Sequence, residues 1–192
     1  LWKCDCTFNR SSELVQAFTF HKLRMTPAHF GVASLAVSQF NSHVVRLAER
    51  LGRTLRYVGP ANLEFKYDQR DGQYKYIEMN PRLGLCNYFD TRCGINNAWH
   101  TYRLALGQDL PPQATAQQDG VIYCAFFEDL YARVNDGERL GSVLRQYLTY
   151  WNRRRVGAYF AWHDPLPGVI NASRWLGRLG RGLARKLFAS HL

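Results

Sequence analysis

The sequence predicts an α+β fold, in which an antiparallel sheet packs against helices and a basic helical extension follows at the carboxyl end. Three observations predict it. Strand-like runs occur in residues 1–23 and again in 59–82, and a helical repeat of apolar residues lies between them. Residues 165–192 carry cations among apolar residues and no acid. We expect the sheet to bury one face on the helix and to present polar residues on the other.

The first half of the chain supplies the predicted sheet. Residues 1–23 mix aromatic and polar positions and predict one or two strands, of which 14–20 is the clearest. A short apolar run follows at 32–37. Residues 38–51 predict a helix that Gly52 ends, because apolar residues recur there at helical spacing: Phe40, Val44, Leu47, Ala48 and Leu51.

The second half is predicted to be mainly helical. Residues 96–106 predict a helix closed by Gly107, and residues 121–127 predict a strand. Residues 140–151 predict a further helix, whose inward face would carry Val143, Leu144, Tyr147, Leu148 and Trp151.

A Pro- and Gln-rich tract at 109–120 is the predicted domain boundary. It separates a lobe, residues 1–110, from an extension, residues 111–192. The extension ends in the basic amphipathic segment 165–192, whose glycines weaken a helix. Two interpretations stay open for this segment: a helix docked on the body of the protein, or contact with an anionic membrane surface or nucleic acid.

Residues 59–82 predict a β-hairpin. A two-residue turn would put a carboxylate on the apolar face of each strand pair. A three-residue loop, 70–72, with Gly72 in the left-handed conformation, avoids this. We therefore predict the register in which three cross-strand pairs form: Glu64–Glu78, Leu63–Met79 and Phe65–Ile77.

Two carboxylates opposed on a sheet repel one another unless positive charge lies between them. Glu64, Glu78 and the amide oxygen of Asn80 form a set of hard oxygen ligands without thiolate or imidazole, which favours Mg²⁺ or Mn²⁺ over Zn²⁺. Nucleotide phosphates usually complete such a site. The alternative is an exposed hairpin whose acids pair with its own cations: Lys66, Lys75 and Arg70.

Glu64 followed by Glu78-Met79-Asn80-Pro81-Arg82 resembles the metal-binding strands of the ATP-grasp superfamily. The pattern is nearest to the carboxylate-amine ligase group and is similar also to carbamoyl-phosphate synthetase and biotin carboxylase. The resemblance covers about residues 15–110, the carboxy-terminal lobe of such a fold. It implies that Glu64, Glu78 and Asn80 hold one or two Mg²⁺ ions on the phosphates of ATP, and that Arg82 steadies the anionic substrate or acyl phosphate.

Residues 21–27 resemble the basic segment that precedes a proline in carboxylase-type members. Lys22 and Arg24 occupy alternate positions and would share a strand face. The resemblance implies that both bind the nucleotide, as Asn80 would. The alternative is two solvated cations on an edge strand.

The composition narrows the class of protein. The net charge of +10 suits polyanions and does not choose among nucleotide, nucleic acid and membrane. Cys4 and Cys6 are too close for a usual zinc pair, so we expect reduced thiols in a cytosolic protein. The chain lacks an initiator Met and the nucleotide lobe of ATP-grasp enzymes. We therefore expect a carboxy-terminal fragment or a truncated product.

The expected function is that of an ATP- and Mg²⁺-dependent ligase, which activates a carboxylate as an acyl phosphate for attack by an amine and so forms a C–N bond. The expected partners are ATP, small-molecule or peptide substrates and, through the basic tail, an anionic membrane surface; nucleic acid is not expected. The alternatives are a bicarbonate-activating, carboxylase-like enzyme and a non-catalytic remnant that acts as a basic interaction module. We expect a cytoplasmic location, with peripheral membrane contact as a variant of it.

Overall fold

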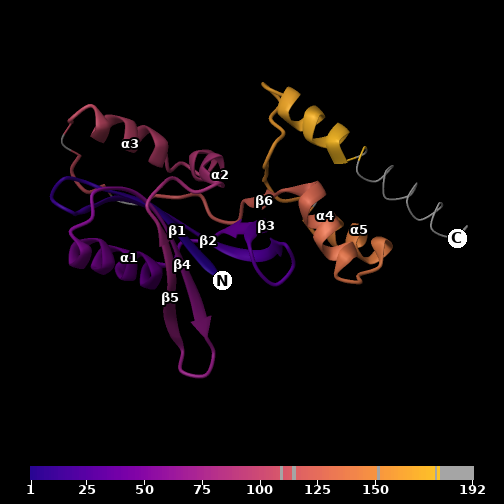
Figure 1. The fold of residues 1–192 in the computed structure, drawn as a ribbon, viewed down its shortest axis with the longest axis horizontal. Helices are drawn as coiled ribbons and strands as arrows, with labels where there is room; N and C mark the ends of the chain where they lie inside the picture. The colour runs from indigo at the N-terminus through magenta and orange to yellow at the C-terminus, as the bar shows by residue number, and fades with distance from the viewer. Residues whose placement is uncertain (109, 114–115, 151, 176, 178–192) are drawn as a thin grey trace, which may run out of the picture.

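A computed structural model shows one seven-stranded sheet with helices on both faces (Figure 1). It describes residues 1–108, 110–113, 116–150, 152–175 and 177. The strands are β1 (Trp2–Phe8), β2 (Leu14–Thr26), β3 (Val32–Ser38), β4 (Gly59–Asp68), β5 (Gln73–Asn80), β6 (Ile122–Cys124) and β7 (Arg155–Gly157). The helices are α1 (Ser42–Leu55), α2 (Asn87–Arg92), α3 (Asn97–Ala105), α4 (Phe126–Asn135) and α5 (Leu140–Leu148).

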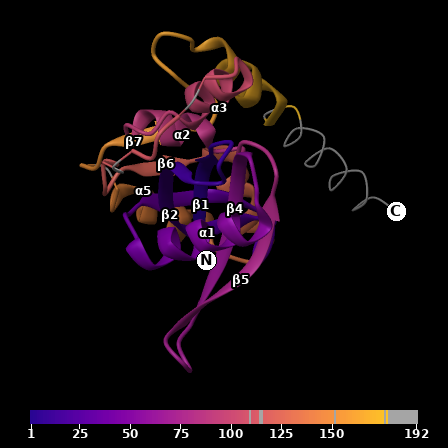
Figure 2. The same cartoon turned by 90° about the vertical axis from the view of Figure 1, so that its left-hand side faces the viewer.

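The strands follow the order β5-β4-β1-β2-β3-β6-β7, so the first strand of the chain lies between β2 and β4. All neighbours from β5 to β6 are antiparallel, which confirms the predicted antiparallel sheet. The short strand β7 adds a parallel edge beside β6. This order places the amino-terminal strand beside the β4–β5 hairpin, whose tip projects from the rest of the sheet (Figure 2).

Helix α1 covers one face of the sheet. Its buried residues Val44 and Ala48 form one cluster with side chains from β1 and β4: Cys4, Cys6, Phe8, Ala61, Leu63 and Phe65. The helix begins after Asn41, because the Asn41 side chain accepts hydrogen bonds from two backbone N–H groups of the first turn. The helix predicted at 38–51 is present, but it begins and ends later in the chain.

Gly52 does not end α1, as the sequence had predicted. It lies inside the helix and is buried, and a Cβ atom there would be 2.1 Å from Phe8 Cε1. The absence of a side chain at Gly52 therefore allows α1 to pack closely against the sheet. The helix instead ends at Leu55, where Arg56 takes the left-handed conformation with φ 50°.

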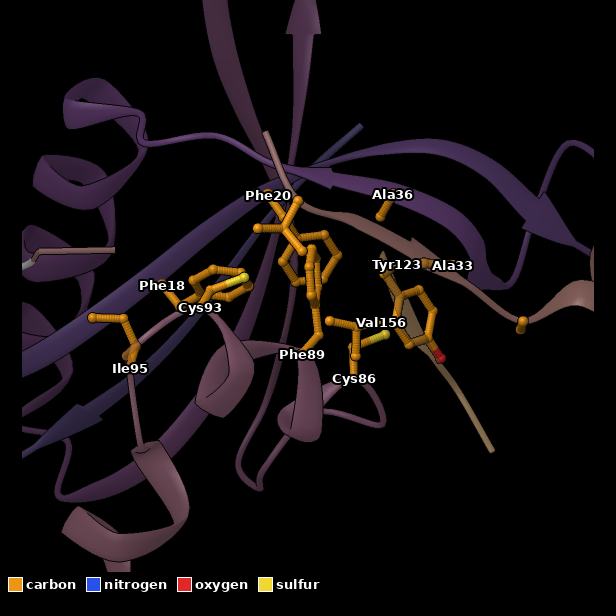
Figure 3. Close-up of a cluster of buried hydrophobic side chains, with 12 residues drawn as sticks. Phe18, Phe20, Ala33, Ala36, Cys86, Phe89, Cys93, Ile95, Tyr123 and Val156 are labelled. Atoms are coloured by element: carbon orange, nitrogen blue, oxygen red, sulfur yellow. The ribbon is translucent and has the colours of Figure 1, made fainter. Parts of the chain in front are cut away.

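Helices α2 and α3 cover part of the opposite face. Phe89 of α2 packs edge-on against Phe18 and Phe20 of β2, with ring centroids 5.1 and 5.7 Å apart (Figure 3). Tyr123 of β6 and Val156 of β7 belong to the same buried cluster. Helix α2 is thereby fixed on the sheet, and beyond it the same face forms the wall of a pocket.

The strand predicted at 121–127 is shorter than expected. It is confined to Ile122–Cys124, and α4 begins at Phe126. The apolar run continues from the strand into the helix, so its pattern hides the boundary. Glu128 and Asp129 mark the helix start, because acids in a first turn interact favourably with its exposed N–H groups.

The helix predicted at 140–151 is present as α5, but its predicted inward face is largely exposed. Val143 is buried, whereas Leu144 and Leu148 are 45% and 65% exposed. Tyr147 packs against Phe126 of α4, with ring centroids 5.0 Å apart. Trp151 lies outside the described residues.

Part of the predicted basic helix is described. Residues 166–175 are helical, and the ring of Trp175 lies 4.9 Å from that of Tyr131 on α4. Residues 176 and 178–192 lie outside the described part of the chain. Among the described helices, none is long and apolar enough to cross a membrane. The division into a lobe and an extension stays a prediction.

Candidate functional site

The hairpin brings two carboxylates together in the predicted register. Glu64 of β4 lies opposite Glu78 of β5, and we call these two residues the acidic pair. Side chains alternate along a strand, so Asn62 and Asn80 lie on the same face as the acidic pair. Three cross-strand pairs share this register: Asn62–Asn80, Leu63–Met79 and Glu64–Glu78.

The route to this register differs from the prediction. The loop has four residues, 69–72, rather than three, and Gly72 takes the predicted left-handed conformation with φ 67°. The longer loop shifts the pairing by one residue, so Phe65 lies opposite Tyr76 and the predicted pair with Ile77 is wrong. A register shift between Glu64 and Phe65, typical of a β-bulge, restores the predicted pairing beyond it.

Two lysine ammonium groups contact Glu64. Lys3 Nζ of β1 lies 2.6 Å from Glu64 Oε2, and Lys22 Nζ of β2 lies 2.8 Å from Glu64 Oε1. Lys3 Nζ is also 3.8 Å from Glu78 Oε1. Lys22 donates a further hydrogen bond of 2.9 Å to the Gly31 carbonyl. The positive charge near the acidic pair therefore comes from lysines of the first two strands. It does not come from the cations of the hairpin itself, as the alternative interpretation expected.

Burial and ion pairing act on Glu64 in opposite directions. Its side chain is 9% exposed, and burial alone would raise its pKa. Hydrogen bonds from Lys22 and Lys3 outweigh that effect and lower the pKa, so Glu64 is ionised at neutral pH. A metal ion at this carboxylate must therefore compete with two ammonium groups for its oxygens.

Asn80 and Arg82 line the same pocket, which has a volume of about 420 Å³ and includes the acidic pair. Asn80 Nδ2 donates a 3.0 Å hydrogen bond to Glu78 Oε1, which leaves the amide oxygen of Asn80 available to a ligand. Arg82 is exposed and donates to the Leu83 carbonyl at 3.1 Å. The pocket is large enough for a small ligand.

Arg24 does not line this pocket. We expected it to share a strand face with Lys22, but the register of β2 against β3 shifts between the two residues. Arg24 Nη1 instead lies 3.0 Å from Asp129 Oδ2, and the guanidinium stacks over Tyr147 at 5.5 Å. The predicted shared face is therefore wrong. The edge-strand alternative is wrong too, because β2 lies inside the sheet and Lys22 is buried.

The oxygen donors fit a hard divalent cation. Glu64 and Glu78 offer carboxylates and Asn80 an amide oxygen, the ligand types that Mg²⁺ and Mn²⁺ prefer. Across the part of the chain that the structure describes, no group of three or more His, Cys, Asp and Glu residues could hold a metal ion. A cation at the acidic pair would thus need further oxygen ligands, such as phosphate groups or water.

Comparison with protein families shows the family to which the chain belongs. The family model for the carbamoyl-phosphate synthase L chain, ATP binding domain, matches residues 15–113, just over half of the chain. The chain belongs to this family. The match confirms the ATP-grasp resemblance and contains the whole hairpin. It ends before β6, so the α4–α5 region lies outside the part that matches this ATP-grasp family.

Similar proteins match short parts of this ATP-grasp chain. D-aspartate ligase of Enterococcus faecium (strain Aus0004) is 36% identical over 73 residues, which are 38% of this chain and 17% of that protein. Acetyl-CoA carboxylase 1 of Oryza sativa subsp. japonica is 36% identical over 53 residues, 28% of this chain and 2% of that protein. The matching part of the chain thus covers less than a fifth of either relative. That this chain shares the activity of either whole relative is therefore a proposal.

Solved structures overlap at low identity. The phosphoribosylaminoimidazole carboxylase ATPase subunit from Aquifex aeolicus has a TM-score of 0.45 at 14% identity, over 59% of this chain and 36% of that chain. N5-carboxyaminoimidazole synthetase from Staphylococcus aureus has a TM-score of 0.47 at 12% identity, over 70% of this chain and 37% of that chain.

Sequence reasoning missed two strand residues of the candidate site, Lys3 and Asn62. Lys3 lies opposite Glu64 because β1 pairs with β4, a contact between segments far apart in the chain. The available signal was polar residues at alternate positions of an otherwise apolar strand, Lys3, Asp5 and Thr7.

Proposed function

We propose that this chain is part of an ATP- and Mg²⁺-dependent ligase, in which a carboxylate is activated as an acyl phosphate and attacked by an amine to form a C–N bond. One observation carries the proposal. The acidic pair, Lys3, Lys22 and Arg82 lie around one site in a chain of an ATP-binding family. The similarity to D-aspartate ligase, which its name describes as a ligase, supports the reaction class.

Each residue has a role in this proposal. Glu64, Glu78 and Asn80 would hold Mg²⁺, and the bound ion would neutralise negative charge on the transferred phosphoryl group. Lys3 lines the pocket and offers its ammonium group to nucleotide phosphates, whereas Lys22 is buried outside the pocket lining and would add its positive charge from behind Glu64. Arg82 offers a planar pair of N–H donors to a carboxylate or acyl phosphate.

The charges at the site predict that metal and nucleotide bind together. Glu64 and Glu78 carry two negative charges, and Lys3 and Lys22 carry two positive charges. A divalent cation alone would leave an excess of positive charge, whereas the phosphates of ATP would remove that excess and attract both lysines. We expect Mg²⁺ to bind weakly without nucleotide and more tightly with a non-hydrolysable ATP analogue.

Calorimetry on the chain tests the proposal. Wild-type protein should bind the Mg²⁺ complex of the analogue, and Glu78→Gln should weaken this binding by roughly ten- to a hundredfold, because a charged contact is lost. The matched control is Glu49→Gln, which changes an exposed ion pair of α1 with Arg53. Equal affinities of Glu78→Gln and wild type would refute the metal site. A wild-type chain that binds no nucleotide would favour the non-catalytic remnant.

A second candidate, a bicarbonate-activating enzyme, is favoured by the similarity to acetyl-CoA carboxylase 1. The two candidates differ in the molecule that must be present for ATP to be consumed. Phosphate release by the complete protein that depends on an amine and a carboxylate supports the ligase. Release that depends on bicarbonate supports the carboxylase.

A further inference from the structure

Asn62 links the acidic pair to a second pair of carboxyl groups. Its Oδ1 accepts a 2.8 Å hydrogen bond from Lys3 Nζ. Its Nδ2 donates to Asp5 Oδ1 on the neighbouring strand, directly across from it in the register of β1 and β4. A continuous line of polar contacts therefore runs from Asp5 through Asn62 and Lys3 to Glu64.

Asp90 of α2 faces Asp5 in the interior. The two residues are 2% and 0% exposed. Asn97 Nδ2 donates to Asp90 Oδ2 at 3.2 Å and to the Asp5 carbonyl at 3.0 Å. Asp5 Oδ2 and Asp90 Oδ1 receive no hydrogen bond from any N–H or hydroxyl group of the described residues. The Asp5 carboxyl group lies near enough to raise the pKa of Asp90, so a proton on one of the two buried groups is favoured over two negative charges.

The surroundings of the two carboxyl groups favour a single negative charge. Burial raises the pKa of Asp5 to about 6, against the effects of the Asn62 hydrogen bond and the nearby charge of Lys3. Burial and then the Asp5 charge raise the pKa of Asp90 well above its usual range. The other charged or titratable groups that interact with them are Arg82, Cys86 and Cys93, together with Cys6, which neighbours Asp5 in β1 and packs on the opposite face of the sheet. Of the two carboxyl groups, Asp90 therefore holds a proton more strongly, and Asp5 more readily carries the negative charge.

The chain segment after Arg82 packs against the side chains of Asp5 and Asn62. A Cβ atom at Gly84 would be 2.7 Å from Asp5 Oδ2 and 2.8 Å from Asn62 Nδ2. Only a glycine allows the backbone to approach so closely. The buried carboxyl groups thus support both Lys3, through Asn62, and the loop that follows Arg82.

We propose that Asp5 and Asp90 form a proton-sharing carboxyl pair that positions Asn62, and through it Lys3, beside the acidic pair. The two aspartates are positioning residues, because they act through Asn62. The Asp5 anion accepts the Asn62 amide N–H, which directs the Asn62 oxygen towards Lys3 and so holds the ammonium group near Glu64. The effect on nucleotide binding rests on the proposed function, whereas the shared proton and the position of Lys3 do not.

Carboxyl ¹³C NMR of the ligand-free chain tests the shared proton. Spectra over a range of pH are assigned with Asp5→Asn and Asp90→Asn. We expect one of the two carboxyl groups to stay protonated at neutral pH and the other to titrate near the value given above for Asp5. Two ionised carboxylates at neutral pH would overturn the proposal. Asp129→Asn is the matched control, because Asp129 is equally buried but bonds to Ser34 and Tyr147.

Exchange of the Lys3 ammonium protons with water tests the positioning role. Asp5→Asn should speed this exchange by about tenfold, as one charge-assisted contact in the line is lost. Asp90→Asn should leave it near the wild-type rate, because a carboxamide N–H replaces the protonated carboxyl as donor, whereas Asp90→Leu should speed it. Equal rates in Asp5→Asn and wild type would overturn the positioning role. If Asp5→Asn does not fold, the contrast between Asp90→Asn and Asp90→Leu decides, and equal rates in those two variants refute the role.

Nucleotide affinity separates this inference from the proposed function. If the chain binds the ATP analogue, Asp5→Asn should weaken binding at neutral pH, and unchanged affinity would refute the effect on binding. If the wild-type chain binds no nucleotide, the proposed function fails. The NMR measurements still decide whether Asp5 and Asp90 share a proton and whether this pair positions Lys3.

Discussion

Lys3 Nζ lies 2.6 Å from Glu64 Oε2, across the pairing of the first strand with the fourth. This contact makes an amino-terminal strand part of a candidate site whose two carboxylates lie on a hairpin far away in the chain. It also neutralises part of the charge that would otherwise force the acidic pair apart. The electrostatic state of the site is therefore set before any ligand binds.

Lys3→Met should lower the free energy of unfolding by about 1–3 kcal/mol at neutral pH, because buried Glu64 loses one of its two ammonium partners. Urea unfolding measures the change. Lys66→Met is the matched control, since Lys66 is exposed on the same strand as Glu64, and it should shift stability by less than about 0.5 kcal/mol. Equal stability of Lys3→Met and wild type would mean that Lys22 alone is enough to neutralise the negative charge of Glu64.

Asp5 should make the protein less stable as the pH rises. Its pKa of about 6 in the folded protein lies above the ordinary value of 3.8. Its contribution is therefore fully present below the ordinary value and is lost as the pH rises through the folded value, by on the order of 2–3 kcal/mol. Glu64 acts in the opposite sense. Its lowered pKa contributes stability above 4.5 that is lost as the pH falls through the folded value.

Urea unfolding across this range of pH measures both effects. Asp5→Asn should flatten the loss of stability that wild type shows between the ordinary and the folded pKa of Asp5. Parallel pH profiles for the two proteins would show that Asp5 titrates normally in the folded state. Asp71→Asn serves as an exposed control, because its carboxylate is 45% exposed and pairs with Lys75 at the surface of the hairpin.

Gly52→Ala should destabilise the fold by about 1–3 kcal/mol, although alanine favours a helix, because the new methyl group would overlap the ring of Phe8. Gly141→Ala on α5 is the matched control. Among the described residues, no atom beyond its chain neighbours and the backbone of its own helix lies within 4 Å of the added Cβ, so the change should be neutral or stabilising by up to about 1 kcal/mol. Thermal unfolding compares the two variants. A stabilising Gly52→Ala would show that α1 can move away from the sheet without loss.

Arg82→Lys should lower turnover of the complete protein more than it lowers ATP affinity. Lysine keeps the charge but loses the planar donor pair, which would cost on the order of 2–4 kcal/mol in the transition state, or roughly thirty- to a thousandfold in rate. Steady-state kinetics of phosphate release measure it, with Arg92→Lys at an exposed position of α2 as control. An effect confined to the apparent ATP constant would assign Arg82 to nucleotide binding.

The hairpin was predictable because its determinants are local. Strand alternation and a glycine in the loop predicted that Glu64 opposes Glu78, and the structure confirms this pair. The pairing itself depends on a bulge that the sequence did not predict, because the loop is one residue longer than expected. The family pattern lies on the same hairpin, so it was also readable. The sequence predicted that α1 is a helix, but not that Gly52 lets the helix approach the sheet, because that role depends on the position of the Phe8 ring.

The sequence by itself determined the acidic pair, the oxygen character of its ligands and the α+β class, since each follows from the order of residues over a short span. Only the tertiary structure decided which cations meet them. The register shift between Lys22 and Arg24 in β2 sends Arg24 to Asp129 and leaves Lys22 beside Glu64. The place of β1 between β2 and β4 brings Lys3 to the site, and no local periodicity predicts it, because pairing between distant strands depends on burial across the whole sheet.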